Sequence, residues 1–147
     1  MISFKNKLSC SAIQLSELII SKDIFFYNYI LKIMSTNKQK FNRKYGFKLD
    51  EGHSKAEIVR LTGIPKRILD KVYYRGVGAR KSNPQSVRSA SSGKKVGGNS
   101  LRGKMSGPQW GYSRIYSFIM KQPGTWQKAD KDLADEVKKL KIKGFMR

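Results

Sequence analysis

The sequence is poor in cysteine and histidine, and this shortage excludes several classes of protein. Cys10 and His53 are its only members of these residue types, and two residues cannot build a zinc finger, a disulfide framework or an all-His/Cys metal site. A Cys–His nucleophile pair is disfavoured, because Cys10 lies in an N-terminal segment and His53 just before a predicted helix. The chain also lacks a P-loop, a G-x-G-x-x-G turn and an H-E-x-x-H motif. We therefore expect a protein that is not an enzyme and needs no cofactor.

Acidic residues are scarce as well. The 147-residue chain has 10 Asp and Glu against 31 Lys and Arg, which gives a formal net charge of +21. A surplus of this size opposes compaction unless a polyanion neutralises it. Nucleic acid is the usual neutraliser, followed by an anionic membrane surface and by an acidic protein. The length suits one domain with attached tails.

The sequence has no apolar run long enough to cross a bilayer. The stretch at 24–31 is uncharged for eight residues, whereas a spanning helix needs about 20. No small-residue cleavage site follows it, so we do not expect secretion. A helix over about 13–33 would be apolar on most of its circumference and would need burial or a partner. Alternatively, residues 34–38 resemble a natural start, which would make 1–33 a rarely translated extension. We expect this apolar N-terminal extension to be dispensable for folding and for binding.

Two short helices are predicted around a glycine turn. The capping box Ser54-Lys55-Ala56-Glu57 starts the first helix, and Gly63 can end it in a left-handed conformation. Pro65 suits the first turn of a second, basic helix, which Gly76 is expected to stop. The pair resembles a helix-turn-helix, although Val59 stands where that motif prefers alanine or glycine. The alternative is an ordinary helical hairpin with a solvated basic face.

Two further helices are predicted towards the C-terminus. Residues 108–120 have the i, i+3, i+4, i+7 spacing of a buried stripe. Residues 130–143 place their acids early and their lysines late, which complements the helix dipole. No stretch alternates in a way that requires a sheet, so the predicted fold is mainly α, a small bundle of about four short helices. The domains are then a basic linker at 34–52, a helical domain at 53–143 and a tail at 144–147.

The strongest functional signal is a stretch of 59 residues without a single acid, between Asp70 and Asp130. Its middle part, 82–107, is rich in Ser, Gly and Lys and poor in core-forming residues, so we predict a flexible basic loop. Such a loop can follow a phosphate backbone and release counterions as each cation docks. The candidate nucleic-acid-binding residues come from this stretch and from the second predicted helix: Lys66, Arg67, Lys71, Arg75, Arg80, Lys81, Arg88, Lys94, Lys95, Arg102, Lys104, Trp110 and Arg114.

Trp110 and Arg114 are candidates for a defined site within this charge. They lie one helical turn apart, so the guanidinium can stack on the indole, and the pair could stack a base and hold a phosphate. Arg75, which follows Tyr74, is a similar case. The alternative, which we favour, is an aromatic side chain at the edge of the core with a packing arginine.

An ordered series of short motifs runs over about residues 53–135: Gly63-Ile64-Pro65 and Tyr73-Tyr74-Arg75-Gly76, then Trp110-Gly111, Arg114 and Ser117-Phe118, then Asp130-Lys131-Asp132-Leu133. This series resembles an uncharacterised family of small basic proteins found in large DNA viruses and marine tailed phages. Members of that family often carry His-Arg-Pro-Gly before the tryptophan, where this chain has Leu101-Arg102-Gly103-Lys104, so no role for a histidine carries over. The resemblance implies a viral setting and a shared fold, without a mechanism.

Three functional hypotheses follow. The first is a non-enzymatic basic protein of a large DNA virus that binds nucleic acid, DNA rather than RNA, through Lys/Arg–phosphate contacts. The second is a structural virion component, such as a minor capsid or core protein, whose basic loop docks on acidic neighbours. The third, suggested only by size and charge, is an RNA binder of ribosomal type. We expect the protein in the virion or in the infected host cell.

Overall fold

The computed structural model describes residues 21–30 and 35–145. The chain divides after Ser35 into two units, which are described separately. In the first unit residues 21–30 are helical, and five apolar or aromatic side chains on them are more than half exposed: Ile24, Phe25, Phe26, Tyr27 and Tyr29. The remainder of the helix predicted over 13–33 lies outside the described residues. No helix in the described ranges combines the length and the apolar character needed to cross a bilayer.

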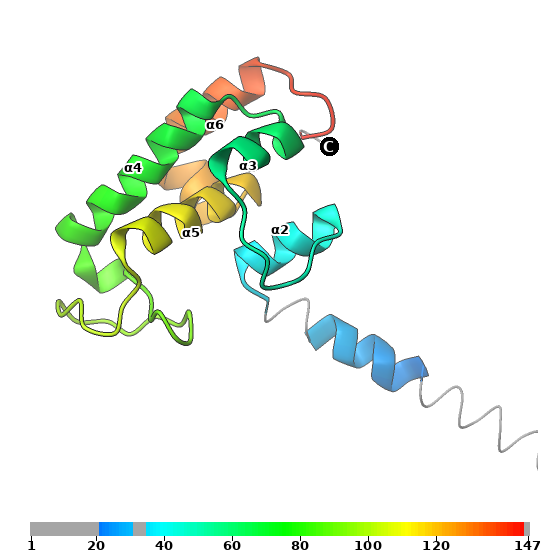
Figure 1. Ribbon diagram of the computed structural model, residues 1–147, viewed down its shortest axis with the longest axis horizontal. Helices are drawn as coiled ribbons and strands as arrows, with labels where there is room; N and C mark the ends of the chain where they lie inside the picture. The colour runs from blue at the N-terminus through cyan, green and yellow to red at the C-terminus, as the bar shows by residue number, and fades with distance from the viewer. Residues whose placement is uncertain (1–20, 31–34, 146–147) are drawn as a thin grey trace, which may run out of the picture. The chain divides into compact units, whose positions relative to one another are not determined.

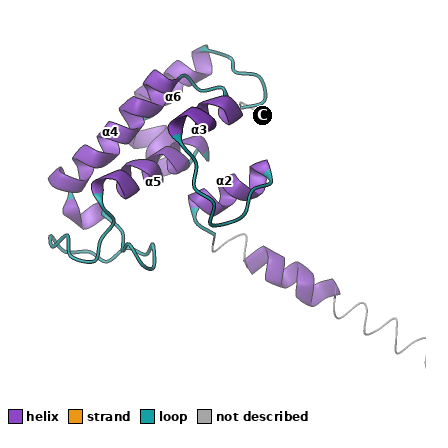
Figure 2. Ribbon diagram, in the orientation of Figure 1, coloured by secondary structure: helices purple, strands orange, loops and turns teal. Residues whose placement is uncertain are grey.

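The second unit is mainly helical, which confirms the prediction of a mainly α fold (Figure 2). Its α-helices are α2 (Asn37–Tyr45), α3 (Lys55–Thr62), α4 (Lys66–Ser82), α5 (Gly107–Ile119) and α6 (Lys131–Lys139). A 3-10 turn, η1 (Pro84–Ser86), follows α4, and a π-helical segment, η2 (Pro123–Ala129), precedes α6. Pairing of the strand type is limited, within the described part of the chain, to two isolated bridges, Arg88 with Lys95 and Ser89 with Lys104.

Helices α4 and α5 lie side by side at the centre of this unit (Figure 1). The prediction that Gly76 stops the second helix is wrong, because α4 continues to Ser82. A Cβ on Gly76 would lie 2.8 Å from the Cα of Gly111, and a Cβ on Gly111 would lie 2.6 Å from the Tyr73 ring. The two glycines therefore allow the helix backbones to approach closely, and this packing outweighs the low helix propensity of glycine.

The core receives side chains from each of these α-helices. The buried apolar residues that form it are Phe41, Ile58, Ile64, Ile68, Leu69, Val72, Ile115, Tyr116, Phe118, Ile119, Trp126, Leu133, Ala134, Val137 and Phe145. The predicted stripe at 108–120 is buried at Ile115, Tyr116 and Ile119. The last helix is shorter than predicted, since α6 ends at Lys139 and leaves Leu140 44 % exposed.

The range predicted as a basic linker, 34–52, contains helix α2, which corrects that expectation. The helix begins at a capping box in which Thr36 and Gln39 bond each other's backbone N–H groups. Phe41 is fully buried, and its ring centroid lies 5.3 Å from that of Tyr116 on α5. Two aromatic residues amid basic and polar neighbours, Phe41 and Tyr45, are a weak signal in the sequence, yet they pack α2 against the core.

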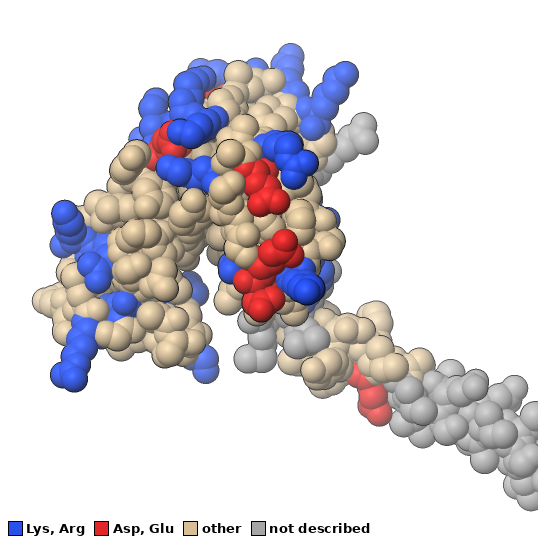
Figure 3. All heavy atoms as spheres, in the orientation of Figure 1, with Lys and Arg blue, Asp and Glu red and all other residues tan. Residues whose placement is uncertain are grey.

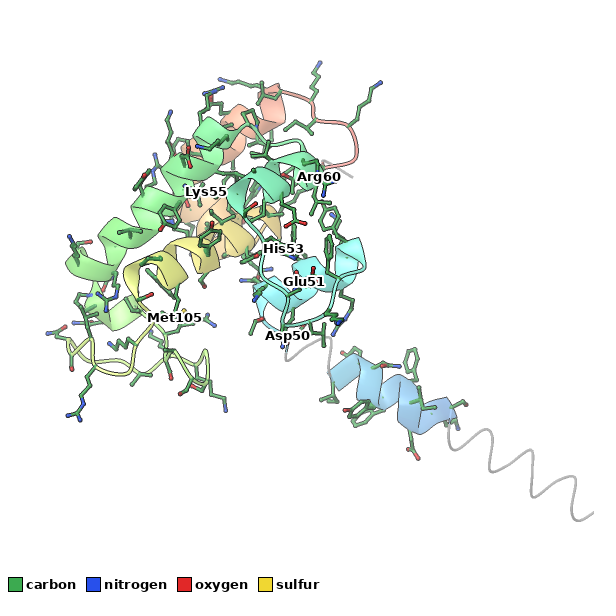
Figure 4. All side chains as sticks on the ribbon, in the orientation of Figure 1. Asp50, Glu51, His53, Lys55, Arg60 and Met105 are labelled. Carbon is green, nitrogen blue, oxygen red and sulfur yellow. The ribbon has the colours of Figure 1, made fainter. Side chains whose placement is uncertain are left out.

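A buried polar cluster ties the segment after α2 to α3. The amide Nδ2 of Asn42 donates hydrogen bonds to three backbone carbonyls, those of Lys48, Leu49 and Glu51. Its Oδ1 lies 2.8 Å from Nε2 of His53, and Nδ1 of the same ring lies 3.0 Å from a carboxylate oxygen of Glu57 (Figure 4). The cluster satisfies the polar atoms of two buried side chains, so the only histidine has a structural role.

Helix α3 begins and ends where the sequence predicts. Ser54 Oγ accepts the backbone N–H of Glu57, and Gly63 adopts a left-handed conformation with φ +74°. The capping box is only half formed, because the Glu57 side chain bonds His53 and does not reach back to the cap.

Candidate nucleic-acid interface

Acidic residues of the second unit are confined to two ranges of the sequence. Between residues 35 and 145 they occur only at 50–70 and at 130–136. Their carboxylates bind nearby cations: Asp70 accepts from Lys55 at 2.6 Å and Lys66 at 2.9 Å, Asp135 from Lys131 at 2.6 Å and Lys138 at 3.1 Å, and Glu136 pairs with Arg67. We call residues 55–75 and 130–138, together with Arg114, the paired region.

Asp130 is the centre of the paired region. It is fully buried, and Arg114 donates to both its carboxylate oxygens, from Nε and Nη2, each at 2.8 Å. Arg75 adds a third bond at 3.0 Å and forks onto Asp132 at 2.7 and 2.6 Å. The network joins α4 and α5 to the start of α6. Two guanidinium groups predicted to hold phosphate are therefore engaged inside the fold.

The pairing changes the acidity of the groups involved. Hydrogen bonds from Arg75 lower the pKa of Asp132 to about 2. The hydrogen bond from Lys55 lowers the pKa of Asp70, and the one from Lys131 lowers that of Asp135. These carboxylates stay ionised at neutral pH and keep the cations beside them occupied.

The predicted stacking of Arg114 on Trp110 is absent from the cation–π contacts of the described residues. Asp130 holds the guanidinium instead, and its pairing with Arg114 agrees with the packing role that we favoured. Trp110 is half-buried in the first turn of α5.

A second region of the folded unit differs from the paired region because it contains no acidic residues. Residues 80–106, which we call the basic lobe, comprise the end of α4, η1 and the loop that leads to α5, and they contain no acid. Its cations are Arg80, Lys81, Arg88, Lys94, Lys95, Arg102 and Lys104. The loop extends from the ends of α4 and α5 (Figure 1), and on the face shown in Figure 3 this part carries blue side chains and no red ones.

The loop of the basic lobe has an internal framework. The Lys104 ammonium is buried and donates to the carbonyls of Pro84 at 2.8 Å and Gly98 at 2.7 Å. Nε of Arg80 donates to the carbonyl of Met105 at 2.7 Å, which ties α4 to the end of the loop (Figure 4). Val87 is fully buried. The prediction that 82–107 is poor in core-forming residues agrees with this structure, since Val87 is the one apolar side chain of that range that is fully buried. The flexibility of the loop stays a prediction.

The candidate cations of the sequence therefore fall into three groups. Lys66, Arg67, Arg75 and Arg114 pair with acids. Lys104 lies inside the lobe, and Arg80 and Arg88 donate to backbone carbonyls, Arg88 weakly at 3.4 Å. The remaining five are exposed, and their ammonium or guanidinium groups have no partner among the described residues: Lys71 and Lys81 on α4, and Lys94, Lys95 and Arg102 in the loop.

Sequence reasoning missed the roles of Asp130 and Lys104. Asp130 is the first acid after a stretch that contains twelve Lys and Arg residues and no acid. This position is a signal from which a pairing of Asp130 with one of those cations could have been predicted. Lys104 has no comparable signal, because its carbonyl partners are backbone atoms that any residue would supply. No cluster of three or more potential metal ligands of the His, Cys, Asp and Glu types occurs in the described ranges.

A comparison with protein families places the chain. The family described as "Family of unknown function (DUF5824)" matches residues 18–140. The chain belongs to DUF5824. The match begins inside the N-terminal extension and includes both the paired region and the basic lobe. Neither the curated proteins nor the solved structures gave a match. The viral setting implied by the resemblance stays a prediction.

Proposed function

We propose that this DUF5824 protein is a non-enzymatic nucleic-acid-binding protein whose basic lobe contacts the phosphate backbone. The separation of charge within the folded unit carries the proposal. Acids pair with most cations of the paired region, whereas the lobe has seven cations and no acid. A surface with unneutralised lysine and arginine binds a polyanion and gains from the release of its counterions.

The lobe is a better candidate than the helix-turn-helix-like pair of α3 and α4. A recognition helix would have to use Lys66 and Arg67, yet Asp70 and Glu136 hold these side chains. Of the candidate binding residues at the start of α4, Lys71 alone has no such partner in the described ranges. Contacts from a basic lobe to phosphates position the ligand without reading bases, so we propose binding without sequence specificity.

The exposed lysines at the end of α6 do not make an equivalent surface. Lys139 ends α6 and Lys141 follows it, and both lie within a few residues of Asp135 and Glu136. A phosphate chain that approaches these lysines also approaches the carboxylates, so electrostatic repulsion opposes the attraction. The lobe contains no carboxylate side chain, so this repulsion does not arise there. We therefore assign the main phosphate contacts to Arg80, Lys81, Arg88, Lys94, Lys95 and Arg102.

The proposal is tested by the salt dependence of DNA binding. Six phosphate contacts predict that log K falls with log salt concentration at a slope of about −5. The measurement is a fluorescence anisotropy titration of labelled DNA with the full chain over a series of salt concentrations. A flat salt response would overturn the proposal. Poly-glutamate serves as the comparison polyanion, and binding to it that equals binding to DNA would indicate an acidic protein as the partner instead.

A further inference from the structure

We infer that the basic lobe selects double-stranded nucleic acid over single strands. The inference rests on the proposed function and specifies the form of its ligand. It follows from three properties of the lobe: the absence of aromatic side chains from its sequence, the position of the nearest aromatic residues, and the hydrogen bonds that link the parts of its loop.

The sequence from Arg75 to Gln109 contains no Phe, Tyr, Trp or His. Proteins that bind single strands stack successive bases on aromatic side chains, because the unpaired bases offer their faces. The lobe has no aromatic side chain to do this. A duplex hides its base faces within its own stack and presents two phosphate strands, which lysine and arginine can contact. The chemistry of the lobe therefore matches the surface of a duplex.

The nearest aromatic side chains do not extend the lobe into a stacking surface. Tyr74 is 65 % exposed, but it lies on the paired region with the Lys55 ammonium 5.6 Å from its ring centroid. That ammonium is held by Asp70 at 2.6 Å, so a strand that reached Tyr74 would meet a carboxylate. Trp110 is half-buried at the start of α5, outside residues 80–106.

The framework of the loop favours a stiff ligand. Lys104 joins η1 to the loop through the carbonyls of Pro84 and Gly98, and a hydrogen bond from the Ala90 N–H to the Gly103 carbonyl at 3.0 Å closes the loop. A preformed surface that meets a stiff duplex loses less conformational entropy than one that must order a flexible strand. The duplex also has about twice the axial charge density of one strand, which increases counterion release.

The experiment uses one base sequence in three forms, which are the two separate strands and the duplex. Each form is prepared as DNA and as RNA. We expect the full chain to bind at least one type of duplex about 10-fold more tightly than the corresponding strands at the same salt concentration. Equal or tighter binding to the single strands would overturn the inference while leaving the proposed function intact. Failure to bind any form would instead overturn the proposed function.

Variants separate stacking from backbone binding. Trp110→Leu and Tyr74→Leu should each leave the ratio of duplex to single-strand affinity unchanged, with a thermal melt to confirm folding. A large fall in single-strand affinity, with the duplex affinity unchanged, would raise this ratio and show that these rings form a stacking site, which contradicts the inference.

Lysine substitutions test the role of the framework with the charge change held constant. Lys104→Met and Lys94→Met each remove one cation, but only the first removes the bonds to Pro84 and Gly98. We expect Lys104→Met to lower the duplex preference severalfold and Lys94→Met to lower both affinities together with no change in preference. An equal effect of the two variants would show that the framework does not determine the preference.

Discussion

The paired region and the basic lobe are both rich in lysine and arginine, yet they differ in what those cations can do. In the paired region Asp130 is buried between two guanidinium groups and the other carboxylates hold most of the cations around them. In the lobe the cations either bind backbone carbonyls or face solvent. The position of the acids, and not the number of basic residues, therefore decides where a polyanion can bind.

The comparison separates stability from binding. Arg75 and Arg114 connect α4 and α5 to the start of α6 through the buried Asp130, so their loss should destabilise the fold before it affects a ligand. The exposed cations of the lobe touch little of the protein, so their loss should reduce binding and leave the fold intact. The predictions below test each half of this division, in order of the expected effect.

The largest effect is expected from Asp130→Asn. The substitution leaves Arg114 and part of Arg75 without their charge partner in a buried site. Removal of one partner of a buried ion pair costs about 3–5 kcal/mol, and we expect the free energy of unfolding to fall by this amount in urea denaturation. The control is Asp132→Asn, whose side chain is 62 % exposed and whose loss should cost at most about 1 kcal/mol. Similar small losses at both positions would show that the network is not a structural centre.

The second largest effect on stability is expected at the close contact between α4 and α5. Gly76→Ala places a Cβ 2.8 Å from backbone of α5, so the helices must separate. We expect a loss of about 1–3 kcal/mol by overpacking. Gly78→Ala, two residues further along α4 with nothing within 4 Å of the new Cβ, is the matched control. It should stabilise the protein by about 0.4–1 kcal/mol, because alanine restricts the unfolded chain. A destabilised Gly78→Ala together with a neutral Gly76→Ala would contradict this account.

The smallest effect on stability is a dependence on acidic pH. Asp132 has an ordinary pKa of 3.8 when unpaired and a pKa of about 2 beside Arg75. Because the folded-state pKa is the lower one, this pair stabilises the fold above about pH 4 and loses its contribution as the pH falls to about 2. Thermal melts between about pH 5 and pH 2 should therefore show a steeper fall in Tm for the natural protein than for Asp132→Asn. Parallel falls would show that the Arg75 pairing contributes nothing to the pH dependence.

The sequence predicted the elements that depend on local chemistry. Ser54 and Gly63 mark the ends of α3, and the apolar spacing around Ile115 marks α5, because caps and helical periodicity act within a few residues. Helix α2 was missed because few apolar side chains carry its packing: Phe41 is fully buried, and Tyr45 packs against the core while partly exposed.

Long-range partners could not be predicted from these patterns. Gly76 looks like a helix stop until Gly111 is placed against it, and Arg114 looks like a phosphate ligand until Asp130 is placed beside it. Both partners lie far along the chain, and local propensity carries no information about them. The acid-free stretch was visible in the sequence, but which of its cations stay free depends on the fold.

The division between the two regions is tested most directly by two matched variants in DNA binding. One replaces Lys81, Lys94, Lys95 and Arg102 of the basic lobe with glutamine, and the other replaces Lys66, Lys131, Lys138 and Arg67 of the paired region. Each removes three lysines and one arginine, so the two proteins have the same net charge. The lobe variant should reduce the slope of log K against log salt by about 3–4, whereas the paired-region variant should keep nearly the natural slope. Equal reductions in the two variants would contradict the account, because net charge alone would then determine binding.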